Sequence, residues 1–222
     1  MKKPTLIYFA GRGRAELIRL VLAEAAVDYD EHHVGRGTPP ANGRPTDIGE
    51  LKALGVLPFG AVPVWEEPGG LRLAQSAAIA NYLARLHGLR GPNPSEEARC
   101  DELLGCVEDV RGELRKVQIA APDERALVRR TLEGSVLPRW FGDLERHLKS
   151  RLDATGFAVG DSLGLADLAL WYLLEMVKDN GMGAAFEGCP ALLAFFGRVG
   201  ARPRLASYFA SPRRPVFTPL PR

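Results

Sequence analysis

The chain has 222 residues, of which 46% are hydrophobic and 25% are charged, and its formal net charge is +2. This composition is that of a soluble globular protein with a full hydrophobic core, and the length allows one or two domains. The charge gives no basis for a nucleic-acid surface, and no apolar run is long enough to span a bilayer, so we expect neither kind of partner.

Three cysteines, Cys100, Cys106 and Cys189, are odd in number and lack the spacing of metal ligands. We expect reduced thiols, no metal and a cytoplasmic protein, because unpaired cysteines are typical of reducing compartments. The start of the chain, Met-Lys-Lys-Pro, lacks the apolar core of a signal peptide.

The first predicted unit is a strand that runs into a helix. Residues 5–9 are β-branched, apolar or aromatic and predict a buried strand, which Gly11 and Gly13 end. From Ala15 the apolar spacing becomes helical. The apolar face of this helix is expected to hold Leu17, Ile18, Val21 and Leu22, with Glu16, Arg19 and Glu24 elsewhere.

Tyr8 falls at the end of this strand, and Arg12 and Arg14 fall in the turn that follows. A phenol at this position faces whatever binds there. Backbone N–H groups at the start of the helix favour a negatively charged partner.

The rest of the first half predicts three more strands and two helices. A proline inside an apolar strand, Pro63, requires a strand edge or a cis peptide bond. The order is therefore β-α-β-α-β-β-α. The elements are a weak strand at 29–34, an open loop at 35–49, a short helix at 50–54 carrying Lys52, strands at 61–65 and 71–73, and a helix with Ser76 as N-cap.

The second half is predicted to be helical throughout. We divide the chain into a first domain at 1–87, a linker at 88–94, and a helical domain with a Pro-rich tail at 95–222. The predicted helices begin at Ser95, at Asp123 with a kink at Pro138, at Leu165 as the buried central helix, and at Pro190; the tail follows Pro212.

Tyr8-Phe9 followed by Arg12-Gly13-Arg14-Ala15-Glu16 resembles the first strand and turn of the cytosolic glutathione transferases of the tyrosine type, in the sigma, pi and mu classes. The resemblance extends over nearly the whole chain. It implies a thioredoxin-like α/β domain, an all-helical domain, a homodimer, and detoxification by conjugating glutathione to hydrophobic electrophiles.

The resemblance also implies roles for individual residues. The matching tyrosine holds the glutathione thiolate and the matching arginine tunes that tyrosine. Two departures weaken the match, because Ile48 and Ala61 stand where relatives often carry Trp and a polar residue. The implied glutathione-binding residues are Tyr8, Arg14, Lys52, the Val62-Pro63 pair with a cis proline, Gln75 and Ser76, together with Asp109 reaching across the dimer.

The electrophile is expected between Phe9, Arg111 and Leu114, with the tail at Phe217 close by. Near Asp167, the family's capping motif keeps only half of its box, because Gly164 replaces the usual Ser or Thr.

Three alternatives remain. Gly11-x-Gly13-x-x-Glu16 is a broken dinucleotide fingerprint, since the third glycine is missing. A transferase-fold binding or structural protein with little turnover is the more serious rival. A glutathione-dependent isomerase, of the prostaglandin D synthase type, is the third. Redox variants that use Cys in place of Tyr8 are discounted, because no cysteine lies in the first domain.

Overall fold

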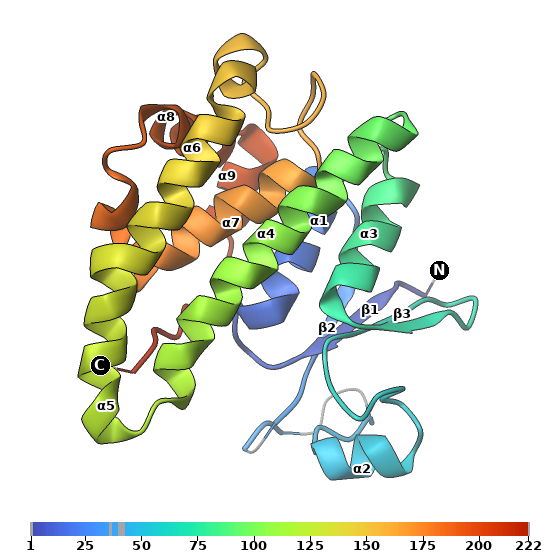
Figure 1. Cartoon of the computed structure of the whole chain (residues 1–222). Helices are drawn as coiled ribbons and strands as arrows, with labels where there is room; N and C mark the ends of the chain where they lie inside the picture. Colours follow the sequence, from blue (N-terminus) through green and yellow to red (C-terminus); the bar gives the residue numbers. More distant parts are fainter. Residues whose placement is uncertain (1, 36, 40–42, 222) are drawn as a thin grey trace. The chain divides into compact units, whose positions relative to one another are not determined.

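The computed structural model describes residues 2–35, 37–39 and 43–221. It divides into two compact units, one formed by Met1–His87 with Ser207–Thr218 and the other by Gly88–Ala206 with Pro219–Arg222. The first unit holds a small mixed sheet and the second is helical (Figure 1). The predicted fold class, a thioredoxin-like α/β domain and an all-α domain, is confirmed.

The sheet of the first unit has four strands in the order β2-β1-β3-β4. β1 pairs in parallel with β2 and antiparallel with β3, and β3 pairs antiparallel with β4. Buried β-branched and aliphatic residues of β1 explain its central place, because both of its faces are covered. The strands are β1 at Thr5–Tyr8, β2 at Asp30–His33, β3 at Val64–Glu66 and β4 at Arg72–Ala74.

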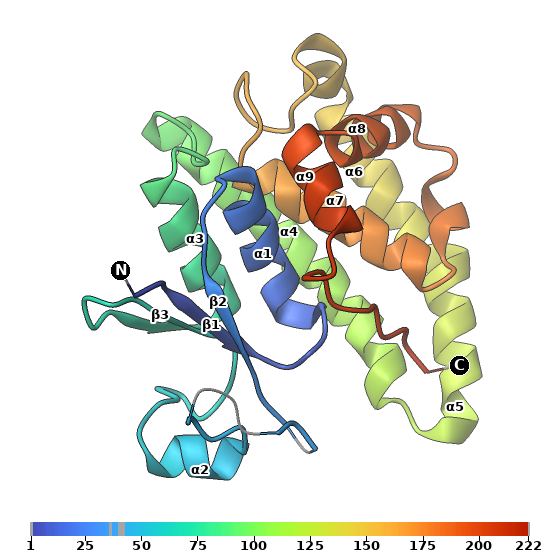
Figure 2. The ribbon, with the colours of Figure 1, turned by 180° about the vertical axis from the view of Figure 1, so that it is seen from behind.

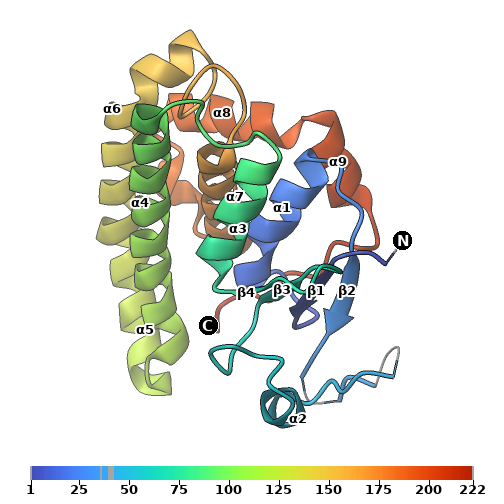
Figure 3. The ribbon, with the colours of Figure 1, turned by 90° about the vertical axis from the view of Figure 1, so that its right-hand side faces the viewer.

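Three helices cover this sheet, namely α1 (Glu16–Glu24), α2 (Ile48–Ala53) and α3 (Ser76–Leu86). Figure 3 shows α1 and α3 on one side of the sheet and α2 on the other. The predicted β-α-β-α-β-β-α order is confirmed. On the α2 side, Ile7 and Val64 of the sheet pack with Leu51 in one buried cluster, which fixes the short helix.

Two expectations for this unit need correction. The N-cap of α3 is Gln75 rather than Ser76, which is already the first helical residue. The strand predicted at 61–65 is β3 at Val64–Glu66, so Pro63 lies before the ladder. The expected cis Val62-Pro63 peptide bond is confirmed. The loop predicted at 35–49 lies partly outside the described residues, at 36 and 40–42.

The second unit is built around α7, which is buried along most of its length and packs against α4 and α8 (Figure 1). The predicted buried central helix is therefore confirmed. The helical segments are α4 at Pro94–Ile119, α5 at Pro122–Thr131, a π-helical turn at Leu132–Val136, α6 at Leu137–Ala154, α7 at Leu165–Asp179, a 3₁₀ turn at Gly183–Phe186, α8 at Pro190–Gly200 and α9 at Pro203–Ala210.

Several helix starts in this unit differ from the predictions. α4 is capped by Asn93, whose side chain accepts the Glu96 N–H, and not by Ser95. Asp123 lies inside the first turn of α5, since Pro122 already opens that helix. The helical run predicted from Asp123 past Pro138 is continuous, but a π-helical turn at Leu132–Val136 joins α5 to α6 just before Pro138.

The half capping box of α7 has a steric reason. Asp167 Oδ2 accepts the Gly164 N–H at 2.8 Å, and the Leu165 N–H donates to the Leu89 carbonyl at 2.8 Å. A Cβ on Gly164 would stand 3.1 Å from that carbonyl oxygen, so a Ser or Thr cap has little room. The segment 88–94 thus packs with the helical unit and is not a free linker.

The C-terminal segment also differs from the sequence-based division. We expected residues 207–218 with the helical domain, but they belong to the first unit. Figure 2 shows this chain, coloured red, passing beside α1. The reason is a set of hydrogen bonds from Tyr208, Arg213 and Arg214 to residues 16–29 of the first unit.

Candidate functional site

Tyr8 ends β1 with its ring buried and its hydroxyl held by the following turn. The Arg14 backbone N–H donates to the Tyr8 hydroxyl oxygen at 2.9 Å. Accepting this bond leaves the phenol proton to be donated elsewhere, and the N–H dipole makes the phenol a stronger donor. Arg14 therefore meets Tyr8 through its backbone, while its side chain is exposed.

Gly13 makes this contact possible. Its φ of +42° lies in the left-handed region, and a Cβ there would stand 2.5 Å from the Tyr8 hydroxyl oxygen. Any side chain at this position would push the phenol away from the Arg14 N–H. The glycine belongs to the site even though it carries no chemical group.

The sheet register brings Tyr8, Pro63 and Gln75 to one edge. Ile7 pairs with Val64, and Val64 pairs with Ala74. Continuing each antiparallel register by one residue puts Tyr8 opposite Pro63 and Pro63 opposite Gln75. Neighbouring strands are about 4.8 Å apart, so the three residues form a row roughly 10 Å long.

Gln75 and Ser76 close the row at the start of α3. Gln75 has φ +71°, an unusual conformation for a residue other than glycine, and such strain gathers at ligand sites. No side chain in the described part of the chain caps α3, so no such cap satisfies its first backbone N–H groups. A carboxylate is a suitable partner for them.

Lys52, on α2, lies beside the loop that leads to Pro63. Asp47 caps α2 by accepting the Gly49 and Glu50 N–H groups at 2.7 and 3.0 Å, which fixes where the short helix begins. The Lys52 Nζ would lie 3.3 Å from a Cβ built on Gly60. Its ammonium group therefore lies beside the segment that leads to the cis bond before Pro63.

The predicted residues of the helical unit lie on α4. Asp109 is exposed, and Leu114 is buried in the core. The Arg111 guanidinium lies over the Tyr172 ring of α7 at 5.8 Å and pairs with Glu108 at 3.5 Å. In the first unit, Phe9 is 44% exposed and meets the Tyr8 ring edge-on at 5.3 Å.

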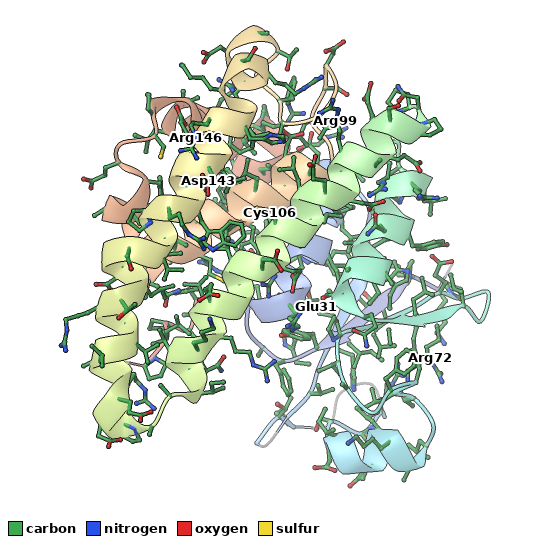
Figure 4. All side chains as sticks on the ribbon, in the orientation of Figure 1. Glu31, Arg72, Arg99, Cys106, Asp143 and Arg146 are labelled. Atoms are coloured by element: carbon green, nitrogen blue, oxygen red, sulfur yellow. The ribbon has the colours of Figure 1, made fainter. Side chains whose placement is uncertain are left out.

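Sequence reasoning missed a buried ionic cluster under the turn. Glu16 and Arg19, predicted away from the apolar face of α1, are both fully buried. Arg19 binds both oxygens of Glu31, labelled in Figure 4, at 2.7 and 3.0 Å. A signal for this burial lies in α1 itself, because apolar residues flank Arg19 on both sides and leave the helix without a continuous polar face.

Burial alone would lower the pKa of Arg19, but its hydrogen bonds and charge contact with Glu31 outweigh this and raise it. The guanidinium therefore stays charged. It also donates to the Gly11 carbonyl at 2.8 Å, inside the turn that follows Tyr8.

Burial disfavours the thiolate form of all three cysteines. All three cysteines are unpaired, and burial raises the pKa of each thiol. Cys106 lies on α4 near Asp143 of α6 (Figure 4), whose carboxylate raises that pKa further after Asp109 and Glu102. No cluster of three or more His, Cys, Asp or Glu in the described ranges could hold a metal ion. No helix among the same residues is long and apolar enough to cross a membrane.

Comparisons with known proteins agree in family. The N-terminal domain model of glutathione S-transferases matches residues 4–85, and a C-terminal domain model of the same family matches residues 108–212. Human glutathione S-transferase A3 is 31% identical over 215 residues, which cover 96% of this chain and 91% of that protein.

Two solved structures extend the comparison. Monomeric Na-GST-3, a glutathione S-transferase of the hookworm Necator americanus, has a TM-score of 0.75 at 29% identity, covering 93% of this chain and 96% of that one. The prostaglandin synthase D of Nilaparvata lugens has a TM-score of 0.79 at 24% identity, covering 96% of this chain and 99% of that one. The second likeness is in fold alone.

Proposed function

We propose that this chain, which belongs to the glutathione S-transferase family, uses Tyr8 to stabilise the glutathione thiolate and conjugates it to hydrophobic electrophiles. The observation that carries the proposal is the Tyr8 hydroxyl, which accepts the Arg14 N–H at 2.9 Å. That bond fixes the phenol and leaves its proton for the sulfur.

The energy of one such bond is sufficient. A free thiol has a pKa of about 8.5, so only a few per cent is thiolate at neutral pH. A hydrogen bond to a charged group contributes about 1.5–3 kcal/mol. At 1.36 kcal/mol per unit, this lowers the thiol pKa by about one to two units, which raises the thiolate share at pH 7 from a few per cent to roughly a quarter to three quarters.

The row of Tyr8, Pro63 and Gln75 suits an extended tripeptide, whose three residues span about 10 Å. In this proposal the Val62 backbone holds the cysteinyl part before the cis bond. Gln75, Ser76 and the start of α3 hold the γ-glutamyl carboxylate, as the helix N-terminus favours.

Lys52 supplies a cation that pairs with the glycyl carboxylate of glutathione. Asp109 is proposed to reach the γ-glutamyl amine from the second subunit of a homodimer. Ile48 and Ala61 contribute no polar group at this end, so we expect Lys52 to carry much of the binding of glycine.

The electrophile is proposed to bind near Phe9, which is 44% exposed beside the Tyr8 ring. A role in detoxification follows from conjugation of hydrophobic compounds. Glutathione is the co-substrate, and the proposal needs no metal. Three unpaired cysteines support a reducing compartment, and we propose the cytoplasm.

Thiolate absorbance of bound glutathione in the near ultraviolet, followed across pH, tests the proposal. In the wild type we expect a midpoint below that of free glutathione, which moves back by about one to two units in Tyr8→Phe. Tyr82→Phe is the matched control, because it deletes a tyrosine hydroxyl elsewhere in the same unit. Tyr82 lies on α3, and its hydroxyl donates to Glu67 at 3.0 Å. Bound glutathione with an unshifted midpoint would indicate a binding protein with little turnover.

The homodimer has its own test. Phe59, in the loop after α2, is 71% exposed, and Leu54 nearby is 63% exposed, so two large apolar groups face out of one short region. We expect Phe59→Ser to convert dimer to monomer in sedimentation velocity. Leu127→Ser, which changes a leucine 60% exposed on α5, should leave the dimer intact. A monomeric wild type would end the dimer proposal and the role of Asp109 with it.

A further inference from the structure

The C-terminal segment 207–218 contacts the turn that fixes Tyr8. We infer that Arg214 and Tyr208 are positioning residues for this turn, residues 11–14, and that they act through Glu16. The inference rests on the proposed role of Tyr8 and extends it to a part of the chain about 200 positions away. Its basis is a buried carboxylate whose partners come from that segment.

Glu16 is the first residue of α1 and comes two positions after Arg14. Its side chain is completely buried. One carboxylate oxygen accepts the Tyr208 hydroxyl at 3.1 Å, and the other accepts Arg214 Nε at 2.9 Å. Burial, and then the charge of Glu16, raise the pKa of Tyr208, so its hydroxyl stays protonated and donates.

Arg214 supplies the second guanidinium for two carboxylates of this cluster, Glu16 and Glu31. His33 Nε2 also lies 3.2 Å from Glu31. The short ion-pair contacts of Arg19 are to Glu31, at 2.7 and 3.0 Å, and Arg19 lies 3.5 Å from Glu16. Arg214 is therefore the nearer cation to Glu16. Without it, two carboxylates share one guanidinium in a buried place, which is costly for a charge pair out of water.

Arg19 links this balance to the turn. The same guanidinium donates to the carbonyls of Gly11 and Arg12 at 2.8 and 3.4 Å. If Arg214 is lost, attraction toward Glu16 draws Arg19 away from these carbonyls. The turn then loses the bonds that hold it just before the Arg14 N–H, which holds Tyr8.

The segment touches the turn a second time at Arg12. Arg12 Nε donates to the Pro215 carbonyl at 3.1 Å, and its guanidinium lies 5.5 Å from the centre of the Phe217 ring. Arg12 and Glu16 stand on either side of Gly13 and Arg14. The segment 207–218 therefore contacts the turn that positions the Tyr8 phenol at both of its ends. Its path beside α1 is seen in Figure 2.

Arg213 offers a matched control within the same segment. It donates to the Tyr29 carbonyl at 2.7 Å and stacks on the Tyr29 ring at 4.6 Å, with Asp28 3.9 Å away. These groups precede β2 and lie outside the turn. Arg213→Met removes the same charge from the same segment but leaves the partners of Glu16 in place.

The first experiment compares Arg214→Met with Arg213→Met in the full-length enzyme, using glutathione and a chromogenic electrophile. We expect Arg214→Met to lower kcat about tenfold, in line with a misplacement well under 1 Å, and to change the KM for glutathione less than about threefold. The thiolate midpoint should move toward that of free glutathione. Arg213→Met should stay within about twofold of wild type in kcat, with an unmoved midpoint.

The second experiment measures amide hydrogen exchange in peptides covering residues 11–16, without glutathione. Arg214→Met should exchange faster there than wild type and Arg213→Met. Glu16→Gln/Arg214→Met removes both charges and should recover protection and kcat relative to Arg214→Met alone. Tyr208→Phe, which deletes one hydroxyl, should raise the exchange of residues 11–16 by less than Arg214→Met does. It replaces Arg214→Met as the test variant if that protein does not fold.

Equal effects in the two arginine variants would overturn the inference, as would unchanged exchange of the turn in Arg214→Met. Failure of the proposed function looks different. In that case Tyr8→Phe leaves the thiolate midpoint unmoved, and the exchange data with the double variant then decide alone whether Arg214 positions the turn.

Discussion

Helices α1 and α7 each begin beside their own fully buried carboxylate. The two carboxylates differ in the kind of partner that binds them. Asp167, at the start of α7, accepts the backbone N–H groups of Ala158 and Gly164 at 2.7 and 2.8 Å. Glu16, at the start of α1, accepts the side chains of Tyr208 and Arg214 at 3.1 and 2.9 Å. The first set of partners lies within nine residues, and the second comes from the other end of the chain.

The difference shows in the charges. Burial raises the pKa of Asp167 from its ordinary value of 3.8 to about 6, against the opposing effect of its backbone partners. The backbone dipoles, together with the charge of Arg202, therefore do not compensate for the lost water. Glu16 instead has guanidinium groups at 2.9 and 3.5 Å. Asp167 fixes the entry to a buried helix, whereas Glu16 ties the C-terminal segment to the turn beside Tyr8.

The largest expected effect comes from deleting the carboxylate with distant partners. Glu16→Leu leaves Arg214, whose side chain is 9% exposed, without its buried partner. We expect the free energy of unfolding to fall by about 3–5 kcal/mol, measured by urea denaturation. A loss below about 1 kcal/mol would mean that Arg214 escapes to water and that the pair is not structurally coupled.

For Asp167, the carboxylate with local partners, we expect a contribution to stability that depends on pH. Because the pKa of Asp167 is near 6 in the folded protein and 3.8 when unfolded, the folded state binds the extra proton between these values. Stability from this group is therefore present below about pH 4 and is lost as pH rises to 6, by up to about 3 kcal/mol. The advantage of wild type over Asp167→Asn should shrink between pH 4 and 7; an advantage that grows would reverse the assigned shift.

Each helix start also contains a glycine, which allows a matched pair of substitutions. Gly13→Ala forces an alanine into a left-handed backbone conformation and places its Cβ 2.5 Å from the Tyr8 hydroxyl oxygen. We expect a loss of about 1–3 kcal/mol in stability and a marked loss of kcat. Gly164→Ala, with its Cβ 3.1 Å from the Leu89 carbonyl oxygen, should cost stability and spare kcat of the remaining folded enzyme. Normal kcat in Gly13→Ala would remove the Tyr8 contact from the mechanism.

The smallest expected effect is that of one hydroxyl. Tyr208→Phe leaves Glu16 with Arg214 and Arg19, so we expect a loss of about 1 kcal/mol, readable as a shift in the urea midpoint. Tyr82→Phe, on α3, is the comparison variant because its hydroxyl meets a half-exposed Glu67. A loss for Tyr208→Phe no larger than for Tyr82→Phe would show that the hydroxyl adds nothing to the cluster.

Local signals in the sequence predicted much of the fold. The strand before Tyr8, the buried α7 and the element order of the first unit are confirmed, because hydrophobic period and glycine breaks act within a few residues. The helix caps were less predictable. Asn93 and Gln75, rather than Ser95 and Ser76, precede α4 and α3, since several polar residues near a helix start compete for the cap position.

Of the candidate site, the place of Tyr8 was predicted from the end of a strand, and the other residues followed from the family resemblance. Tyr8, the Val62-Pro63 pair and Gln75 were identified from the sequence, and the register now brings them to one edge. Their roles toward glutathione stay predictions. Glu16 and Arg19 were predicted to lie off the apolar face of α1, but both are buried, because the helical spacing of charges does not specify which distant groups will cover them.

By itself the sequence determined the elements, the family resemblance and the position of the Tyr8 turn, all of which depend on residues close together in the chain. Only the tertiary structure decided that residues 207–218 join the first unit and complete the charge of Glu16. The physical reason is that a buried charge takes any partner the fold brings within about 3 Å, and no local pattern specifies a partner 198 positions away.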